Sequence, residues 1–268
     1  MKTGRNAPSQ SGKVSPGFDY PVVLLAALLF LGCSSHRIQQ KANGPNPASA
    51  GAGPGGISVE RLLQAAVEQP YTRPPGAGWQ ALFDGKTLQG WKPTSFPGGG
   101  KTGCEQGLIL MESGSPFTGI TRVERIPTMD YEVTLEALRL SGSDFFCGLT
   151  VPVLNSSCSL IVGGWGGSLV GISSLDGRDA SENETTRTMD FENGRWYRIR
   201  VRVTSARLEA WIDEQQVANV VTTNKRIAVR PGDIELSQPF GICCWQTFAA
   251  CRNLQIRLVN IPSAPVPK

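Results

Sequence analysis

A stretch of strict two-residue alternation, from Trp196 to Asp213, constrains the fold more than any other feature of the sequence. Apolar side chains occupy every second position of two runs, and folding them about Ser205-Ala206 brings the two apolar faces together. The pairs predicted on the apolar face are Val203 with Leu208, Val201 with Ala210, and Ile199 with Ile212. Those predicted on the opposite face are Arg202 with Glu209, Arg200 with Trp211, and Arg198 with Asp213. A slip of one residue would bury the arginines, so the pattern fixes the register.

The arginine-bearing face of this strand pair has two interpretations. It is either a solvent face whose charges neutralise one another, or a surface that binds an anion. Every arginine already has a cross-strand partner, either an acidic residue or an indole ring. We therefore predict a self-paired solvent face.

Similar period-two runs extend over residues 78–260, separated by Gly, Asn and Asp, without a strong helical pattern or an internal repeat. That length and pattern predict one all-β domain, a sandwich or a barrel, followed by a short tail at 261–268. The net charge of +4 is spread along the chain, so nucleic acid is not an expected partner.

The N-terminus has the layout of a secretory signal over residues 1–33. Basic residues precede an apolar segment, Pro21–Gly32, which is far shorter than the roughly 20 residues of a membrane-spanning helix. Leu31-Gly32-Cys33 closely resembles a bacterial lipobox, which implies lipidation of Cys33; the alternative is an ordinary cleaved signal followed by a free Cys33. Ser34 favours the outer membrane under lipoprotein sorting rules. We expect an exported protein of the bacterial cell envelope, held on the outer membrane by its N-terminal lipid and facing the periplasm.

Residues 34–77 are rich in Pro, Gly, Ala, Ser and Asn, a composition typical of a flexible tether. One short amphipathic helix is expected within them at 57–69, started by Ser58 and stopped by Pro70.

Cysteine and histidine usage limits the chemistry. His36 is the only histidine and lies in the expected tether, which excludes a Ser-His-Asp or Cys-His arrangement and a histidine-ligated zinc site within the domain. No cofactor or metal is expected.

Adjacent Cys243 and Cys244 should point to opposite faces of a strand. We interpret "GICCWQTFAACRN" as a hairpin turning near Gln246-Thr247, with Cys251 bridged to one of them and the remaining thiols packed as small apolar groups. Export would let disulfides persist, and the pairing of Cys104, Cys147, Cys158, Cys243, Cys244 and Cys251 stays open.

Four segments together resemble a large bacterial family, the 3-keto-disaccharide hydrolases. They are "GWQALFDGKTLQGWK", "DYEVTLEALRLSGSDFFCGLTVPV", "NGRWYRIRVRVTSARLEAWIDEQQV" and "FGICCWQTFAACRNLQIRL", and they span nearly all of Gly78–Val259. The resemblance implies a concanavalin A-like jelly roll of two antiparallel sheets, here preceded by the signal segment and the flexible tether. It also implies a carbohydrate ligand. This chain departs from the family where many members carry Glu-x-Gln and Asp-His-Gly: it reads "CSLIVGGWGGSLVG" and "CCWQTFAA" there.

Six candidate site residues lie in one polar loop, Leu175–Arg187, which follows the glycine-rich "GGWGGSLVG". Trp165 of that stretch and Trp245 are the aromatic residues expected at a sugar platform, because the glycines would let a ligand approach the backbone. A 3-keto sugar needs one base to remove the C2 proton and one group to polarise the ketone, whereas a typical glycosidase needs two carboxyls. The loop could supply both kinds of group, or it could simply be a solvated rim. The candidate catalytic residues are Asp176, Asp179, Glu182 and Glu184, and the candidate substrate-binding residues are Arg178, Arg187, Trp165 and Trp245.

Three functions follow as hypotheses. A glycan-active hydrolase predicts carboxylates converging in a concave pocket. A non-catalytic carbohydrate-binding module predicts aromatic residues there without a paired acid. An envelope protein that binds another protein predicts an exposed apolar patch instead. The sequence leaves the sugar and the oligomeric state open.

Overall fold

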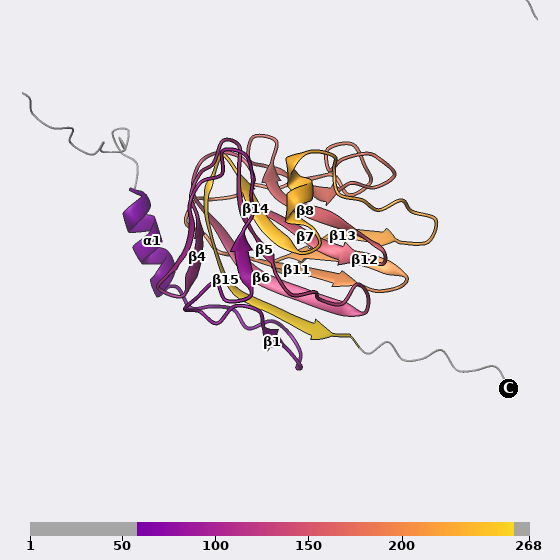
Figure 1. The fold of residues 1–268 in the computed structure, drawn as a ribbon, viewed down its shortest axis with the longest axis horizontal. Coiled ribbons are helices and arrows are strands. Elements are labelled where there is room, and N and C mark those ends of the chain that lie inside the picture. The colour runs from indigo at the N-terminus through magenta and orange to yellow at the C-terminus, as the bar shows by residue number, and fades with distance from the viewer. Residues whose placement is uncertain (1–57, 260–268) are drawn as a thin grey trace, which may run out of the picture. The chain divides into compact units, whose positions relative to one another are not determined.

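The computed structural model describes residues 58–259, which form two antiparallel sheets packed face to face (Figure 1). Sheet A has the order β13-β12-β11-β6-β15-β4-β3, with β1 beside β15, and sheet B has the order β10-β9-β8-β7-β14-β5-β2. The strands of sheet A are β1 Gln80–Ala81, β3 Thr102–Glu105, β4 Leu108–Met111, β6 Tyr131–Ser141, β11 Tyr197–Val203, β12 Arg207–Ile212, β13 Gln215–Val221 and β15 Phe248–Leu258. Those of sheet B are β2 Trp91–Pro93, β5 Phe117–Arg122, β7 Cys147–Val153, β8 Ser156–Gly164, β9 Leu169–Ser173, β10 Arg187–Thr188 and β14 Gly241–Trp245. The predicted jelly-roll sandwich is confirmed.

The strand pair predicted from alternation is β11 with β12, and its register is confirmed. Ile199 lies opposite Ile212, Val201 opposite Ala210, and Val203 opposite Leu208. These side chains belong to the core between the sheets. On its other edge β11 pairs with β6, a strand that is buried along nearly its whole length.

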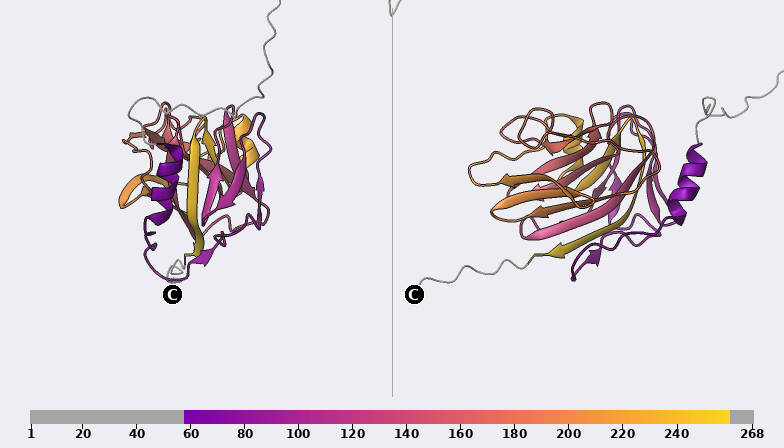
Figure 2. Two further views of the ribbon diagram at one scale, coloured as in Figure 1. Left: turned by 90° about the vertical axis from the view of Figure 1, so that its left-hand side faces the viewer. Right: turned by 180° about the vertical axis from the view of Figure 1, so that it is seen from behind.

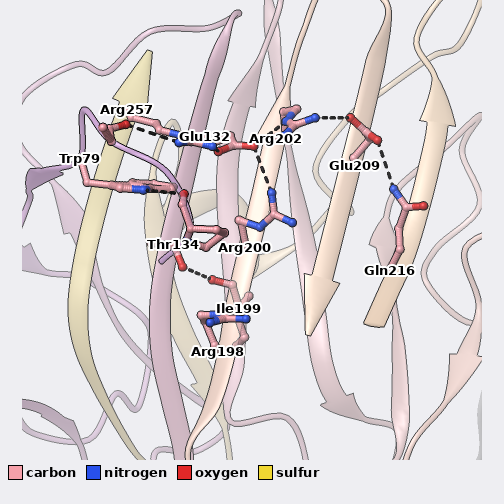
Figure 3. A network of polar contacts seen from close by, with 12 residues as sticks. Trp79, Glu132, Thr134, Arg198, Ile199, Arg200, Arg202, Glu209, Gln216 and Arg257 are labelled. Carbon is pink, nitrogen blue, oxygen red and sulfur yellow. Dashed lines mark hydrogen bonds and ion pairs between the residues drawn. The ribbon is translucent and has the colours of Figure 1, made fainter. Parts of the chain in front are cut away.

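The arginine face is self-paired, as predicted, and it is centred on a carboxylate that the strand pair alone did not indicate (Figure 3). Glu132 of β6 is 0% exposed and accepts hydrogen bonds from Arg200 at 3.1 Å, Arg202 at 2.5 Å and Arg257 at 2.6 Å. The guanidinium of Arg200 also lies 3.7 Å from the centre of the Trp211 ring. The outer surface of sheet A is thus a connected ion-pair network.

The segment carrying the three C-terminal cysteines differs from its expected form. β14 lies in sheet B and β15 in sheet A, so the chain crosses between the sheets at Gln246-Thr247. The predicted hairpin is therefore wrong: Cys251 pairs with strands of sheet A, and Cys243 with strands of sheet B. Cys243 and Cys244 do point to opposite faces, since Cys244 lies in the core and Cys243 in a separate cluster.

No disulfide joins cysteines within residues 58–259, so the expected bridge from Cys251 is absent. Five of the six thiols are buried, and Cys104 is half-buried. Burial raises the pKa of the Cys158, Cys243 and Cys251 thiols to about 12. These groups therefore stay protonated at neutral pH and pack as small apolar side chains.

One helix, α1 Val59–Glu68, lies within the range 57–69 for which the sequence predicts a helix. Ser58 caps it by accepting a hydrogen bond from the backbone N–H of Arg61, and the indole of Trp196 donates to the carbonyl of Ala66 at 3.0 Å. Arg252, paired with Glu136 at 2.7 Å, donates to the backbone just beyond the helix. The helix is thereby fixed to the outer face of sheet A (Figure 2).

The signal segment with Cys33, the histidine and most of the expected tether lie outside the described residues, as does the tail. Within residues 58–259, no helix has the length and apolar character needed to cross a membrane.

Candidate functional site

The outer face of sheet B, the face turned away from sheet A, is covered by loops and carries side chains in three rows. One row contains hydroxyls and one glycine: Thr121, Gly241, Thr150, Ser159 and Ser173, which are opposite one another across five strands. Two residues along lies a row of small residues and one isoleucine: Gly119, Cys243, Gly148, Ile161 and Gly171. Phe117 and Trp245 begin the third row. The face thus changes from polar to aromatic along the strands.

A cavity of about 290 Å³ opens on this face. This volume is just below the range of about 300–1,000 Å³ typical of small-ligand sites. Its lining residues are Phe117, Asp144, Phe145, Ile161, Trp165, Ser173, Arg230, Ile234 and Trp245. The rings of Phe117 and Trp245 meet edge to face with centroids 4.6 Å apart. Ile234 comes from the short 3-10 helix η1 Asp233–Ser237, which packs over β5 and β14. The cavity is therefore mainly apolar, with a few polar groups at defined positions.

Both tryptophans that the sequence selected as a sugar platform line this cavity. Trp165 lies on the turn between β8 and β9 and is 43% exposed, whereas Trp245 ends β14 and is half-buried. Trp165 and the two glycines after it all have positive φ values, so the turn depends on Gly166 and Gly167. A side chain at Gly167 would also approach the carbonyl oxygen of Ser143 to 2.9 Å.

A carboxylate and a guanidinium supply the charges of the cavity. Asp144 accepts hydrogen bonds from the backbone N–H groups of Phe145 at 2.7 Å and Gly166 at 3.1 Å, so it also holds the turn that carries Trp165. The guanidinium of Arg230 lies 5.9 Å from the centre of the Trp165 ring. An ion pair of 3.7 Å joins Arg230 to Asp179. The lining itself carries one negative group, Asp144, and one positive group, Arg230, so its charges are balanced.

A family model for the 3-keto-alpha-glucoside-1,2-lyase-like domain matches residues 78–257. The chain belongs to this family. The resemblance seen in the sequence over Gly78–Val259 is thereby confirmed. No protein of curated function matches the chain in sequence.

Solved structures similar to this family member share little sequence with it. A putative glycosyl hydrolase from Parabacteroides distasonis is 14% identical, with 68% of this chain and 94% of that chain covered and a TM-score of 0.43. The carbohydrate binding module CBM66 from Bacillus subtilis is 11% identical, with 63% and 95% covered and a TM-score of 0.40. The Crh5 transglycosylase in complex with NAG is 8% identical, with 69% and 85% covered and a TM-score of 0.45.

None of the four carboxylates selected from the sequence lines the cavity of this lyase-like domain. Asp176 and Glu184 share the ammonium of Lys225, at 3.0 and 2.8 Å. The pKa of Asp176 is lowered by hydrogen bonds from the Arg226 backbone and Lys225, and that of Glu184 chiefly by the hydrogen bond from Lys225. Glu182 is exposed. Asp179 accepts hydrogen bonds from Ser181 and reaches the cavity only through its ion pair with Arg230.

The two selected arginines also lie away from the cavity. Arg178 is exposed, and Arg187 donates to backbone carbonyls of its own loop. Of the eight candidates, the structure brings together Trp165 and Trp245, with Asp179 joined through Arg230.

The polar groups that do line the cavity were missed. They are Asp144, in the turn before β7, Ser173, at the end of β9, and Arg230, in the loop before η1. Asp144 has a partial sequence signal: it ends the polar stretch "SGSD", which precedes a buried strand and is typical of a turn. Within residues 58–259, no cluster of three or more Asp, Glu, Cys or His side chains is arranged to hold a metal ion.

Proposed function

We propose that this domain binds a glycoside by taking one sugar ring into the cavity on sheet B, with Trp165 and Trp245 as its packing surfaces. The observation that carries the proposal is the convergence of these two tryptophans, from the β8–β9 turn and the end of β14, on a single cavity. Membership of the lyase-like family favours an α-glucoside, particularly one oxidised at C3, as the ligand class.

The chemistry of the cavity suits a sugar. A pyranose has apolar C–H faces that pack on aromatic rings, while its hydroxyls require hydrogen-bonding partners. The cavity offers Phe117, Trp245 and Trp165 for the first purpose. Asp144 can accept hydrogen bonds from hydroxyls, and Arg230 can donate to them. Nearly balanced charge favours a neutral sugar over a strongly anionic one.

Calorimetric titration of the full chain with trehalose and 3-keto-trehalose tests this proposal. We expect saturable binding of one or both disaccharides, with a stoichiometry of one. Inositol, a polyol ring without a glycosidic bond, serves as a control. If neither disaccharide binds at millimolar concentration, the proposal of an α-glucoside site is wrong.

Cleavage of a 3-keto glucoside by elimination is a second candidate function, favoured by the presence of Asp144 and Arg230 in the same cavity. In that reaction Arg230 polarises the C3 ketone and Asp144 takes the proton from C2. The C1–O bond then breaks as the C1–C2 double bond forms, and the departing oxygen takes up a proton. Among residues 58–259, Asp144 is the only carboxylate that lines the cavity, so hydrolysis by a carboxylate pair has less support.

Replacing the candidate base separates the two functions. If elimination occurs, Asp144→Asn should reduce turnover of 3-keto-trehalose at least about 100-fold, because general base catalysis is lost. The matched control is Asp176→Asn, which alters a carboxylate that pairs with Lys225 outside the cavity and should change turnover less than about fivefold. Product release and binding are measured on the same samples. Equal turnover by the wild type and Asp144→Asn would exclude Asp144 as the base.

We further propose that Cys33 is lipidated and anchors the chain to the outer membrane of a bacterial envelope. The support is the sequence alone: a basic region, a short apolar segment and a cysteine directly after Gly32. In cells fed radiolabelled palmitate, the wild type and the Cys104→Ser variant should incorporate the label, whereas Cys33→Ser should not. Equal labelling of Cys33→Ser would contradict the anchor.

A further inference from the structure

Building on the sugar site proposed above, we propose that the hydroxyl of Ser173 binds one oxygen atom of the sugar at the floor of the cavity. Ser173 would thereby determine which ring position must carry an oxygen. Neither its sequence context nor its family membership marks this residue. The inference comes from its place in sheet B and from its lack of a hydrogen-bond partner.

Strand alternation directs Ser173 towards the cavity. Its neighbour Ile172 points into the core between the sheets, so the side chain of Ser173 lies on the outer face of β9. Ser173 is opposite Ser159 of β8 and lines the cavity together with Ile161 of the same strand. With 1% of its surface exposed, Ser173 is a deeply buried part of the cavity lining, whereas Trp165, at 43%, is a solvent-exposed part.

Other hydroxyls in the same row have protein partners. Thr121 bonds to Thr94 at 2.7 Å, and Thr150 bonds to Ser159 at 2.8 Å. Ser173 is different: its Oγ is buried and finds no hydrogen-bond partner among residues 58–259. The adjacent Ser174 donates its own hydroxyl to the carbonyl of Ala228 at 3.4 Å.

A buried hydroxyl without a partner is unfavourable, and most buried polar groups in proteins are paired. A ligand oxygen that reaches Ser173 would provide the missing hydrogen bond without breaking an existing one. Around it the lining is apolar, with Ile161, Ile234 and Phe117. Ser173 would therefore discriminate strongly between sugars that carry an oxygen at that ring position and sugars that lack it, because the latter leave the serine unpaired.

The matched pair Ser173→Ala and Ser237→Ala tests this role. The hydroxyl of Ser237 is also buried, but Ser237 does not line the cavity. In calorimetric titrations of the full chain with 3-keto-trehalose, Ser173→Ala should weaken binding about tenfold, the effect of one hydrogen bond. Ser237→Ala should leave the Kd unchanged. The Tm of Ser173→Ala should not fall, since no protein hydrogen bond is lost.

Monodeoxy analogues of methyl α-glucoside identify the oxygen, and each is titrated against the wild type and Ser173→Ala. One analogue should bind the wild type about tenfold more weakly than its parent, yet bind Ser173→Ala as well as the parent does. The role of Ser173 is refuted, and the sugar site stands, if Ser173→Ala weakens the binding of every analogue by the same factor. The same conclusion follows if Ser173→Ala binds the sugars with normal affinity while Trp245→Ala does not. No binding by the wild type to any of these sugars would refute both.

Discussion

Glu132→Gln should lower the free energy of unfolding by about 3–5 kcal/mol, because it removes the charge that three arginines share. The carboxylate is 0% exposed and bonds to Arg200, Arg202 and Arg257, which come from two strands on either side of β6. Without it, three partly buried guanidinium groups lie close together with Glu209 as the remaining acid, 3.6 Å from Arg202. Urea unfolding followed by circular dichroism measures the loss.

The same carboxylate gives the fold a dependence on pH. Burial acts to raise the pKa of Glu132, but the hydrogen bonds and charges of Arg202 and Arg257 together outweigh it and hold the pKa below its usual value of 4.5. A carboxyl with a depressed folded-state pKa stabilises the fold fully above its unfolded pKa and loses that contribution as the pH falls through the folded value. Below about pH 4.5 the wild type should therefore lose stability, and Glu132→Gln should lose less.

Glu124→Gln is the control for this prediction. Glu124 also pairs with an arginine, Arg122 at 2.6 Å, but 70% of its side chain is exposed. Exposed pairs are worth little, so its removal should cost less than about 1 kcal/mol. Equal losses for Glu132→Gln and Glu124→Gln would mean that the buried network on sheet A does not stabilise the sandwich.

Replacing both Trp165 and Trp245 by alanine should weaken binding of 3-keto-trehalose by more than about 100-fold. Large aromatic side chains commonly contribute about 2 kcal/mol or more each at the centre of a binding site. Trp165→Ala is the cleaner single variant, because Trp165 is 43% exposed and its loss should hardly affect stability. Trp245 packs on Phe117 and Phe145, so its replacement will also lower the Tm.

A tryptophan on the other sheet provides the comparison. Trp211 stacks with Arg200 on the outer face of sheet A, and Trp211→Ala should leave the affinity unchanged. Titrations are made at a temperature where all variants remain folded. Retained affinity in the Trp165 and Trp245 double variant would place the sugar somewhere other than this cavity.

The strand pair β11–β12 could be predicted from the sequence because its two faces meet different surroundings. One face is apolar and the other carries arginines, so alternation gave both the strands and their register. Sheet B offers no such contrast. β7 and β8 are buried on both faces, the core side and the side under the loops, so their sequences do not show which residues point into the cavity.

Two errors also have physical causes. A turn between two strands looks alike in sequence whether it closes a hairpin or crosses between sheets, and Gln246-Thr247 makes the crossing. The placement of Asp176 and Glu184 depends on Lys225, which lies far along the chain and holds both carboxylates by ion pairs. Trp165 could be selected because glycines surround it. Ser173 could not, since its unpaired hydroxyl follows only from the packing around it.

The most direct test of the sugar site is a crystal structure of the full chain grown with 3-keto-trehalose. We expect one sugar ring in the cavity on sheet B, packed against Trp165 and Trp245, with an oxygen within hydrogen-bond distance of Ser173. A disaccharide bound on another face, with the cavity free of sugar, would contradict the assignment of this cavity as the carbohydrate site.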